Sequence, residues 1–360
     1  MKKALSIILA VAMLLALVVG CGGGDEKDPG SSTDSSTTST SEGNEGNEGG
    51  SAAGKRIAVC MGSINHPVHR IVQMGFMTMG EELGMAPEIS GLDEGSMQEL
   101  MAKWESSVSN GVEGILAWVG DDSAYEFLKT VKGMDCYVTV PHFPHSYQDT
   151  KDFIDRNLSC LPDTYGREAA KFVVERLEAK GVTEGSIGIT QNGPNVTENA
   201  ANDGFRSQML DLGTKFTIAD TVYEGAEVAE AATKVTSVIQ SNADIVAGFG
   251  TTGGSPQSWA TAMENTGKTD LVVVGMDYTE LNVNLVKEGK ITAIVCQPLY
   301  VEAQECVKTL KELFEGKTFT GSESEWFVEL DAPLAYIDGE GDHDINSYDE
   351  IIKKVVEYFK

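Results

Sequence analysis

The chain has 360 residues, and its 55 acidic side chains against 27 basic ones give it a net charge of −28 at pH 7. Nucleic acids and anionic lipid surfaces repel such a charge, so neither is expected as a partner. After the first 20 residues no stretch of about 18 apolar residues occurs, and the rest of the chain is expected to be soluble.

The first 20 residues are expected to be a signal for secretion, because Lys2 and Lys3 precede an apolar stretch, Ala4–Val19, that is too short for a membrane span. The sequence Val18–Cys21 resembles the lipobox of bacterial lipoproteins, in which small residues precede a cysteine. The resemblance implies that the leader is removed and that Cys21 receives a diacylglyceryl group, whose acyl chains, such as palmitate, anchor the protein in the cell membrane. An ordinary secretory signal with an incidental cysteine is the alternative.

Residues 21–54 are expected to form a flexible linker. They consist mainly of Gly, Ser, Thr and acidic residues, and contain no aliphatic side chain larger than alanine that would help to form a core. A coil of this length spans about 30 Å between its ends. The folded part therefore starts near residue 55.

The 306 residues from 55 to 360 are more than one hydrophobic core usually organises, which favours two lobes. Short apolar runs alternate with segments of helical period such as Val68–Leu83 and Met97–Val108. This alternation predicts β-α-β units and parallel sheets. The predicted strands are Ile57–Met61, Val112–Trp118, Cys136–Val140, Ser186–Thr190, Phe216–Val222, Ile245–Phe249, Leu271–Val274, Ile291–Cys296 and Trp326–Leu330.

Two helix starts have recognisable signals. Pro67 suits the first turn of a helix that begins after Asn65 or His66. Ser347 and Glu350 have the spacing of a capping box in front of a C-terminal helix, Ile351–Phe359.

Beyond Cys21 the chain has five cysteines: Cys60, Cys136, Cys160, Cys296 and Cys306. Their number is odd, no two have C-x-x-C spacing, and Cys60 and Cys296 lie inside apolar strand-like runs. Buried free thiols are the favoured interpretation, and one disulfide among them is the alternative.

Four segments in order resemble the type I periplasmic sugar-binding proteins of the ribose-binding kind. Ile57–Pro67 is similar to the first strand and the loop into the first helix, and Asn199–Phe205 to the segment ending in Gly-Phe on the first helix of the second lobe. Val272–Asp277 is similar to a strand that ends in a cleft aspartate, and Glu288–Pro298 to the helix-turn-strand that reaches a cleft glutamine. The resemblance covers essentially all of residues 55–330.

The resemblance implies an α/β fold of two doubly wound lobes joined by three crossing segments, with a ligand cleft between them, in agreement with the rule for ligands of open parallel sheets. The crossings are expected near Cys160–Pro162, Gln297–Leu299 and Phe327–Leu330. The N-terminal lobe would then comprise 55–160 plus 299–327, and the C-terminal lobe 161–298 plus 328–360.

The function that the resemblance implies is binding, outside the cytoplasm, of a small neutral polyhydroxylated solute such as a sugar or polyol. The lobes close around it and deliver it to an ABC-type permease and its ATPase. Neither a reaction nor a cofactor is expected, and the protein is expected to be a monomer.

Three polar residues are candidates for hydroxyl recognition. The Asp277 carboxylate is an acceptor only, and ionised acceptors form short, strong hydrogen bonds. Asn199 and Gln297 donate and accept at once, which suits neighbouring hydroxyl pairs. The alternative roles are a helix N-cap before Tyr278 for Asp277, and surface or crossing-strand amides for the other two.

The histidines mark a departure from the family pattern. His66 and His69 stand where ribose-type proteins place other side chains after the first strand, and Pro141 and His142 stand where an Asp-Arg pair is common. We expect these histidines to bind hydroxyls in the cleft. Binding of Zn²⁺ or a metal chelate, with His145 included, and exposed loop positions are the alternatives.

Trp118, at the end of a predicted strand, is a candidate stacking platform or else a core residue. Thr252, in the loop Gly250–Ser255, matches a ligand-contacting position of the family, and Glu224 matches another.

Other functions are open at this point. The same fold can present a bound ligand to a membrane receptor kinase, which would make the chain a sensor. A carrier of a metal or metal chelate is a further alternative, and an enzyme with this fold is the most distant one.

Overall fold

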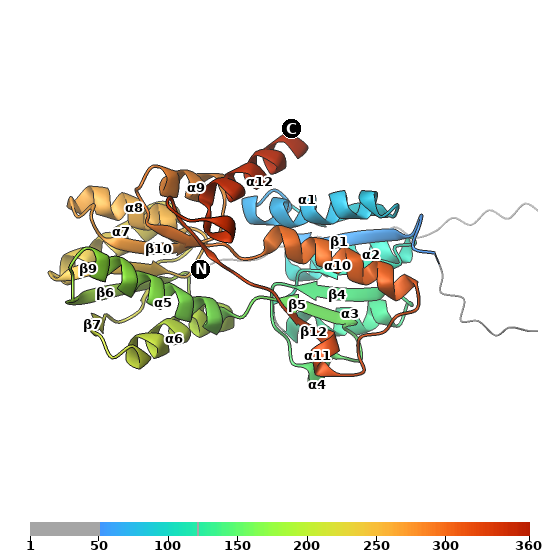
Figure 1. Ribbon diagram of the computed structural model, residues 1–360. Coiled ribbons are helices and arrows are strands. Elements are labelled where there is room, and N and C mark those ends of the chain that lie inside the picture. Colours follow the sequence, from blue (N-terminus) through green and yellow to red (C-terminus); the bar gives the residue numbers. More distant parts are fainter. Residues whose placement is uncertain (1–50, 121) are drawn as a thin grey trace, which may run out of the picture. The chain divides into compact units, whose positions relative to one another are not determined.

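The computed structural model describes residues 51–120 and 122–360, which include all the predicted strands and helices of the folded part (Figure 1). The predicted leader, the predicted lipidation of Cys21 and most of the predicted linker lie outside the described residues.

The first lobe is built on a six-stranded sheet with the order β12-β5-β4-β3-β1-β2, in which every pairing is parallel. The strand β1, next to the edge strand β2, pairs Val59 with Ile89 on one side and with Leu116 on the other. The strands of this sheet are β1 (Arg56–Gly62), β2 (Ala86–Leu92), β3 (Gly114–Ala117), β4 (Tyr137–Pro141), β5 (Arg156–Ser159) and β12 (Phe327–Glu329).

Successive residues of β1 point to opposite faces of this sheet, and both faces are buried. Ile57 and Val59 belong to a core that also contains apolar residues of α1 and α10, while Ala58 and Cys60 belong to a core with residues of α2 and α3. The helices are α1 (Pro67–Glu82), α2 (Met97–Ser109), α3 (Tyr125–Lys132), α4 (Tyr147–Thr150), α10 (Leu299–Phe314) and α11 (Glu323–Trp326).

The second lobe is built on a seven-stranded sheet with the order β13-β11-β10-β9-β6-β7, in which β8 also pairs with β6. The pairings are parallel except that of β13 with β11. The strands are β6 (Glu184–Gln191), β7 (Lys215–Ile218), β8 (Val222–Tyr223), β9 (Ile245–Gly250), β10 (Val272–Met276), β11 (Ala293–Val295) and β13 (Leu334–Ala335).

Helices cover both faces of the second sheet as well. Residues of α5 and α6 share a core with Ile187 and Val274, and residues of α7, α8 and α9 share a core with Val273. The helices are α5 (Pro162–Ala179), α6 (Val196–Asp211), α7 (Val228–Ser241), α8 (Ser255–Thr266), α9 (Glu280–Lys287) and α12 (Ile345–Tyr358). These two sheets with their helices confirm the predicted fold class.

The chain passes between the two sheets three times. It leaves the first sheet after β5 and enters α5, returns after β11 into α10, and crosses again between β12 and β13. The last crossing is visible in Figure 1 as the red segment that leads from β12 to α12.

The expected helix start at Pro67 is confirmed, and His66 is the N-cap of α1. The predicted capping box of Ser347 and Glu350 is wrong, because α12 begins at Ile345 and the Asp344 side chain accepts a hydrogen bond from the Asn346 backbone N–H at 2.9 Å. Asp344 therefore caps the first free backbone N–H groups of α12, and the helix begins before Ser347.

The strand predictions were wrong in two respects. The predicted strand Phe216–Val222 is two short strands, β7 and β8, and strands β2, β5 and β13 were not predicted. The buried free thiols are confirmed, since all five cysteines of the described residues are unpaired and buried. Among the helices of the described part, none is both long and apolar enough to cross a membrane.

Candidate functional site

A cavity of about 680 Å³ lies where loops of both lobes meet. Its volume is in the range of small-molecule sites. One wall is the start of α1, and the opposite wall consists of loops that follow β6, β8, β9 and β10, with one face of α12 along the edge. The residues used below that line this cleft are His66, Val68, Thr252, Gly253, Asp277 and Leu281.

Asp277 directly follows β10 and has a left-handed backbone conformation, with φ of 65°. Asn282 fixes this conformation, because its side-chain amide donates to the carbonyl oxygens of Met276 and Asp277, both at 3.0 Å, and of Gly253 at 2.9 Å. The interpretation of Asp277 as a helix N-cap is wrong, since Thr279 caps α9 and accepts from the Asn282 N–H. The Asp277 side chain therefore does not cap the helix that follows it.

The Asp277 side chain is 8% exposed, and its Oδ1 has no hydrogen-bond partner in the described part of the chain. Burial raises the pKa of this carboxyl from 3.8 to about 6; nearby His142 lowers the pKa, and Glu302 and Glu198 raise it further. At neutral pH most of the molecules thus carry a buried carboxylate with an unused acceptor atom.

Gly253 makes room for this carboxylate. A Cβ atom at position 253 would lie 2.5 Å from Asp277 Oδ2, which is closer than any non-bonded contact allows. The neighbouring Thr252 lines the cleft, and the loop leads into α8 as expected. The glycine is therefore required by the position of the aspartate.

Glu224 lies deeper than the cleft wall. It is 1% exposed, and its carboxylate accepts hydrogen bonds from the hydroxyls of Ser255 and Ser258. Burial raises the pKa of Glu224, and these hydroxyls lower it in part. Contact of this residue with a ligand stays a prediction, and its visible role is to hold the start of α8.

The two candidate amides lie in different places. Asn199 is exposed in the first turn of α6, where its Oδ1 accepts from Gln191 Nε2 at 3.1 Å. Gln297 is buried at the second crossing, with its Nε2 3.9 Å from the Cys160 sulfur of the first crossing. A role of either in ligand binding stays a prediction.

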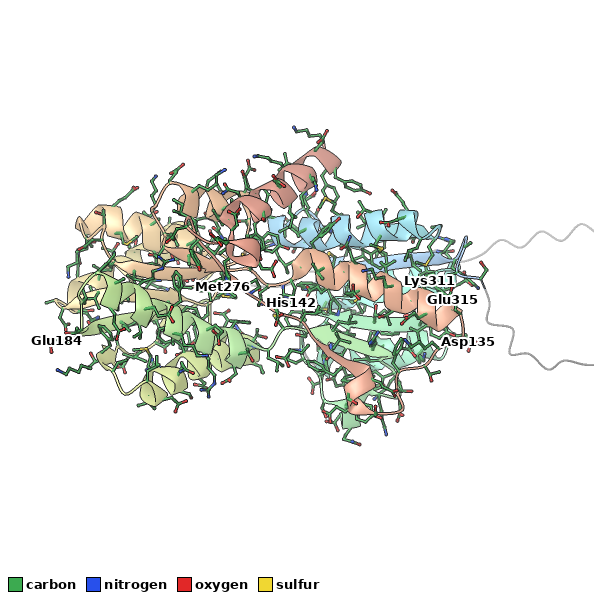
Figure 2. All side chains as sticks on the ribbon, viewed as in Figure 1. Asp135, His142, Glu184, Met276, Lys311 and Glu315 are labelled. Atoms are coloured by element: carbon green, nitrogen blue, oxygen red, sulfur yellow. The ribbon has the colours of Figure 1, made fainter. Side chains whose placement is uncertain are left out.

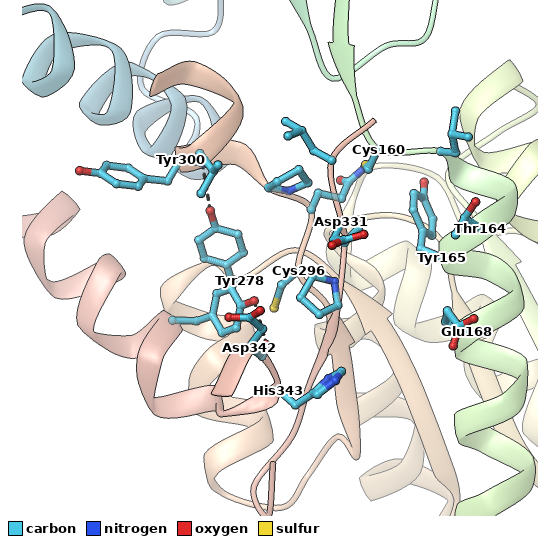
Figure 3. Close-up of a pocket in the computed structure, with 18 of the residues that line it drawn as sticks. Cys160, Thr164, Tyr165, Glu168, Tyr278, Cys296, Tyr300, Asp331, Asp342 and His343 are labelled. Carbon is cyan, nitrogen blue, oxygen red and sulfur yellow. Dashed lines mark hydrogen bonds between the residues drawn. The ribbon is translucent and has the colours of Figure 1, made fainter. Parts of the chain in front are cut away.

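Gln297 lines a second cavity, of about 570 Å³, which is bordered by all three crossing segments. Figure 3 shows this hinge cavity, with Cys160, Cys296 and Asp331 on the three crossings. The Tyr300 backbone N–H donates to the hydroxyl of Tyr278 at 3.2 Å across its wall. Any change in the angle between the lobes therefore alters this cavity.

On the first lobe, the candidate aromatic residues form a continuous row. The ring centroids of His66 and His69 are 5.0 Å apart, and those of His69 and Trp118 are 5.4 Å apart. Trp118 stacks on His142 with centroids 4.4 Å apart and an interplanar angle of 22°. Trp118 is partly buried, and one of its faces is covered by this imidazole rather than free for a sugar.

The first two histidines of the row are neutral at physiological pH. Burial lowers the pKa of His66, and burial together with His66 lowers the pKa of His69 to about 4. His69 Nδ1 lies 2.5 Å from the Gly62 carbonyl oxygen, so Nδ1 carries the proton and Nε2 is left as an acceptor. Neutral imidazoles suit hydroxyl groups better than anions.

A metal centre finds no support at these histidines. In residues 51–120 and 122–360, no group of three or more His, Cys, Asp or Glu side chains is arranged to hold a metal ion. His145 lies apart from the row, with its Nε2 donating to the Val119 carbonyl at 3.0 Å and its Nδ1 2.9 Å from the Tyr125 hydroxyl.

Sequence reasoning missed Glu302. This residue lies on α10 just after the second crossing, is fully buried, and approaches His142 Nδ1 to 3.4 Å. In the sequence it is one of several acidic residues on an amphipathic helix, and nothing in the pattern distinguishes it from its exposed neighbours. Figure 2 shows His142 and Met276, the residue before Asp277, at the junction of the two lobes.

Several solved structures share this fold. A sugar-binding protein of a sugar ABC transporter from Bacillus halodurans has a TM-score of 0.72 and 13% identity, over 82% of this chain and 99% of that one. An ABC transporter solute-binding protein from Agrobacterium vitis with bound D-fucose has a TM-score of 0.68 and 21% identity, over 80% and 98%. The XylFII–LytSN complex has a TM-score of 0.65 and 17% identity, over 79% and 98%.

A comparison with curated protein sequences finds no match. The family model described as periplasmic binding protein domain matches residues 57–318, more than two thirds of the chain. The match includes β1, α1, the Asp277 loop and α10. The chain therefore belongs to the periplasmic binding protein family.

Proposed function

We propose that this chain is an extracytoplasmic solute-binding protein that captures a small neutral sugar or polyol and delivers it to an ABC-type permease. The observation that carries the proposal is Asp277, a desolvated carboxylate with an unused acceptor atom at the floor of a cleft between two lobes. Such an atom costs free energy until a donor binds it. A sugar hydroxyl is a donor of suitable size.

The rest of the cleft suits the two sides of a sugar. Thr252 and the neutral His66 offer polar contacts to further hydroxyls, and Val68 and Leu281 offer apolar contacts to C–H faces. Leu281 is 59% exposed, so its side chain is accessible to a ligand from the cleft. Binding through both lobes would shift an equilibrium from open to closed molecules.

The anchor belongs to the same proposal. Lipidation at Cys21 would hold the folded part on a flexible linker beside the membrane. The linker would raise the effective concentration of the protein at its permease without adding a contact. No reaction is part of the proposed function.

Thermal unfolding of the purified protein tests the proposal against a panel of aldohexoses, pentoses, deoxysugars and polyols. A solute present at about 100 times its Kd stabilises a folded protein by about 2.7 kcal/mol, which corresponds here to an increase in Tm of roughly 5 °C. In the Asp277→Ala variant this increase should disappear, because the acceptor is gone.

Asp135→Ala is the matched control. Asp135 is exposed, has a φ of 59°, and therefore loses the same side chain from the same type of backbone. Figure 2 places it at the end of the first lobe far from the junction. An unchanged Tm increase in Asp277→Ala would refute the assigned site, and a panel without any active solute would refute the proposed ligand class.

A second candidate function is a sensor that presents the closed lobes to a membrane receptor kinase. The observation that favours it is that XylFII, which shares this fold, was solved as a complex with LytSN. Genes for a permease and an ATPase beside the gene of this protein would support transport, and a gene for a receptor kinase would support sensing.

A further inference from the structure

Unsatisfied buried polar atoms gather at one point between the lobes. In the described residues, four of the five buried side-chain N or O atoms without a hydrogen-bond partner are His142 Nδ1, Asp277 Oδ1 and both carboxylate oxygens of Glu302. Folded proteins rarely leave such atoms unpaired. Asp277 lines the cleft and lies within electrostatic reach of both His142 and Glu302, which points to a shared role.

Glu302 and His142 are oriented toward each other. Glu302 Oε1 lies 3.4 Å from His142 Nδ1, and the two side chains are 0% and 10% exposed. A buried carboxylate is costly unless it is paired, and the His142 imidazole is the nearest partner that the structure records for it. A shift of either side chain by a few tenths of an ångström would bring the carboxylate oxygen and Nδ1 to the usual hydrogen-bond distance.

The conformation of His142 requires support from its surroundings. Its φ of 70° is rare for a residue with a side chain. Its N–H donates to the Leu158 carbonyl at 2.9 Å, and its own carbonyl accepts from the Ser159 hydroxyl at 2.6 Å. Trp118 covers one face of the ring. Backbone and ring are thus fixed so that Nδ1 faces Glu302.

We propose that Glu302 is a positioning residue for solute binding: its carboxylate accepts the Nδ1–H of His142, and the Nε2 side of the imidazole is thereby presented to the cleft opposite Asp277. The inference rests on the proposed function, because it assigns a role in the same cleft. One solute hydroxyl could then donate to Asp277 Oδ1 and a neighbouring hydroxyl to the unprotonated Nε2 of His142, so that one solute would join the two lobes.

Ionisable groups from three elements surround His142. Glu302 faces it from α10, Asp277 from the end of β10, and His69, which is neutral because burial lowers its pKa, from α1. Cys160 and Cys306 beside Glu302 are also neutral, because burial raises the pKa of both thiols. The two carboxylates are therefore the charges that act on the imidazole.

Nitrogen-15 NMR of the histidine rings tests this arrangement in the protein without solute, with the His142 signals assigned from a His142→Gln variant. We expect the neutral His142 ring to carry its proton on Nδ1. In Glu302→Gln the amide oxygen still accepts this proton, so the neutral ring should keep the Nδ1–H form. In Glu302→Met the neutral ring should change to the Nε2–H form.

Glu305→Gln is the control on the same helix, since Glu305 is half-exposed and pairs with Lys308 at 2.7 Å. It should change neither the His142 spectrum nor the affinity for the solute that stabilises the wild type. Glu302→Gln should weaken that affinity about tenfold at pH 7.5, which corresponds to the loss of one charge-assisted hydrogen bond.

A wild-type His142 ring with its proton on Nε2 alone would overturn the inference without any variant. A neutral ring that keeps its proton on Nδ1 in a folded Glu302→Met protein would do the same. A normal NMR result in a protein that binds no sugar or polyol would instead count against the proposed function and leave the Glu302–His142 pair in place.

Discussion

Single residues with left-handed backbone follow the strands that end at the cleft. Ser63 follows β1, His142 follows β4 and Asp277 follows β10, with φ values of 48°, 70° and 65°. Each such conformation costs about 1–3 kcal/mol and persists only where neighbouring contacts enforce it. The hydrogen bonds from Asn282 and from Ser159 supply this enforcement for Asp277 and His142.

Asp277→Asn should stabilise the protein without solute at pH 8. The pKa of this carboxyl rises from 3.8 to about 6 on folding, so the stability contributed by its neutral form is fully present below pH 3.8 and is lost as the pH rises through about 6. Asparagine is neutral at every pH and tolerates φ of this sign. The expected gain at pH 8 is on the order of 3 kcal/mol in the free energy of unfolding, with little or none near pH 4.

Thermal melts of wild type and Asp277→Asn between pH 4 and 8 measure this difference. A Tm difference between the two proteins that increases with pH supports a buried, unpaired carboxylate. A Tm difference that is constant across the pH range, or a variant that is less stable at pH 8, would show that a partner already stabilises the charge of the carboxylate.

At the scale of elements, the backbones of α5 and α6 approach each other closely. A Cβ at Gly166 would lie 2.0 Å from the Ala201 carbonyl oxygen, and one at Gly204 would lie 2.3 Å from the Asp163 carbonyl oxygen. The two helices therefore touch through reciprocal glycines. Their contact supports the face of the second sheet that bears the Phe205–Phe249 stack, with centroids 4.9 Å apart.

Gly204→Ala should destabilise the protein by about 1–3 kcal/mol, because the helices must separate to admit the methyl group. Gly193→Ala serves as the control, since a Cβ at that position meets no atom within 4 Å. Denaturant unfolding of both variants provides the measurement. Equal stability of the two would show that α5 and α6 adjust without cost.

The sequence predicted the elements whose signal is local. Strands such as β1 and β10 are continuous apolar runs because both faces of their sheets are buried. The edge strand β2 contains Pro87 and Gly91, and β5 contains the fully buried Asn157, so neither has an apolar run. Asn157 is satisfied by the carbonyls of Val140 and Phe143, which are distant in sequence.

In the candidate site, too, the features with a local signal were predicted and those that depend on distant contacts were not. Loops after parallel strands were predicted to share a cleft, and His66, Thr252 and Asp277 do line one cavity. Burial of Glu302 and the three hydrogen bonds of Asn282 depend on which helices pack against which loops. A periodic pattern contains no information of that kind, so these two residues were not predicted.

At the scale of the whole molecule, the contacts between the lobes determine how the lobes can move when a solute binds. Three crossings border one cavity. Helix α12 of the second lobe contacts α9 of its own lobe and α1 of the first lobe, and the Arg70 guanidinium of α1 lies 5.2 Å from the centroid of the Phe359 ring. Motion of the lobes must rearrange these contacts. The free energy for that rearrangement would come from the solute.

Solute binding should reduce the radius of gyration measured by small-angle X-ray scattering, because a solute that contacts both lobes favours the closed molecule. The reduction should follow the same saturation curve as the increase in Tm. Asp277→Ala should retain the open scattering profile at every solute concentration. A wild-type profile that does not change at saturation would mean that binding occurs without closure.

The buried thiols have a practical consequence. Burial raises the pKa of Cys136 to about 12 and raises the pKa of the other four as well, so the thiolate that reacts with maleimides is scarce at pH 7. A single cysteine introduced on the rim of the cleft would thus be the preferred attachment point for a dye in the described part of the chain. Without removal of any of these five cysteines, the described part of the chain offers a scaffold for a fluorescent reporter of solute binding.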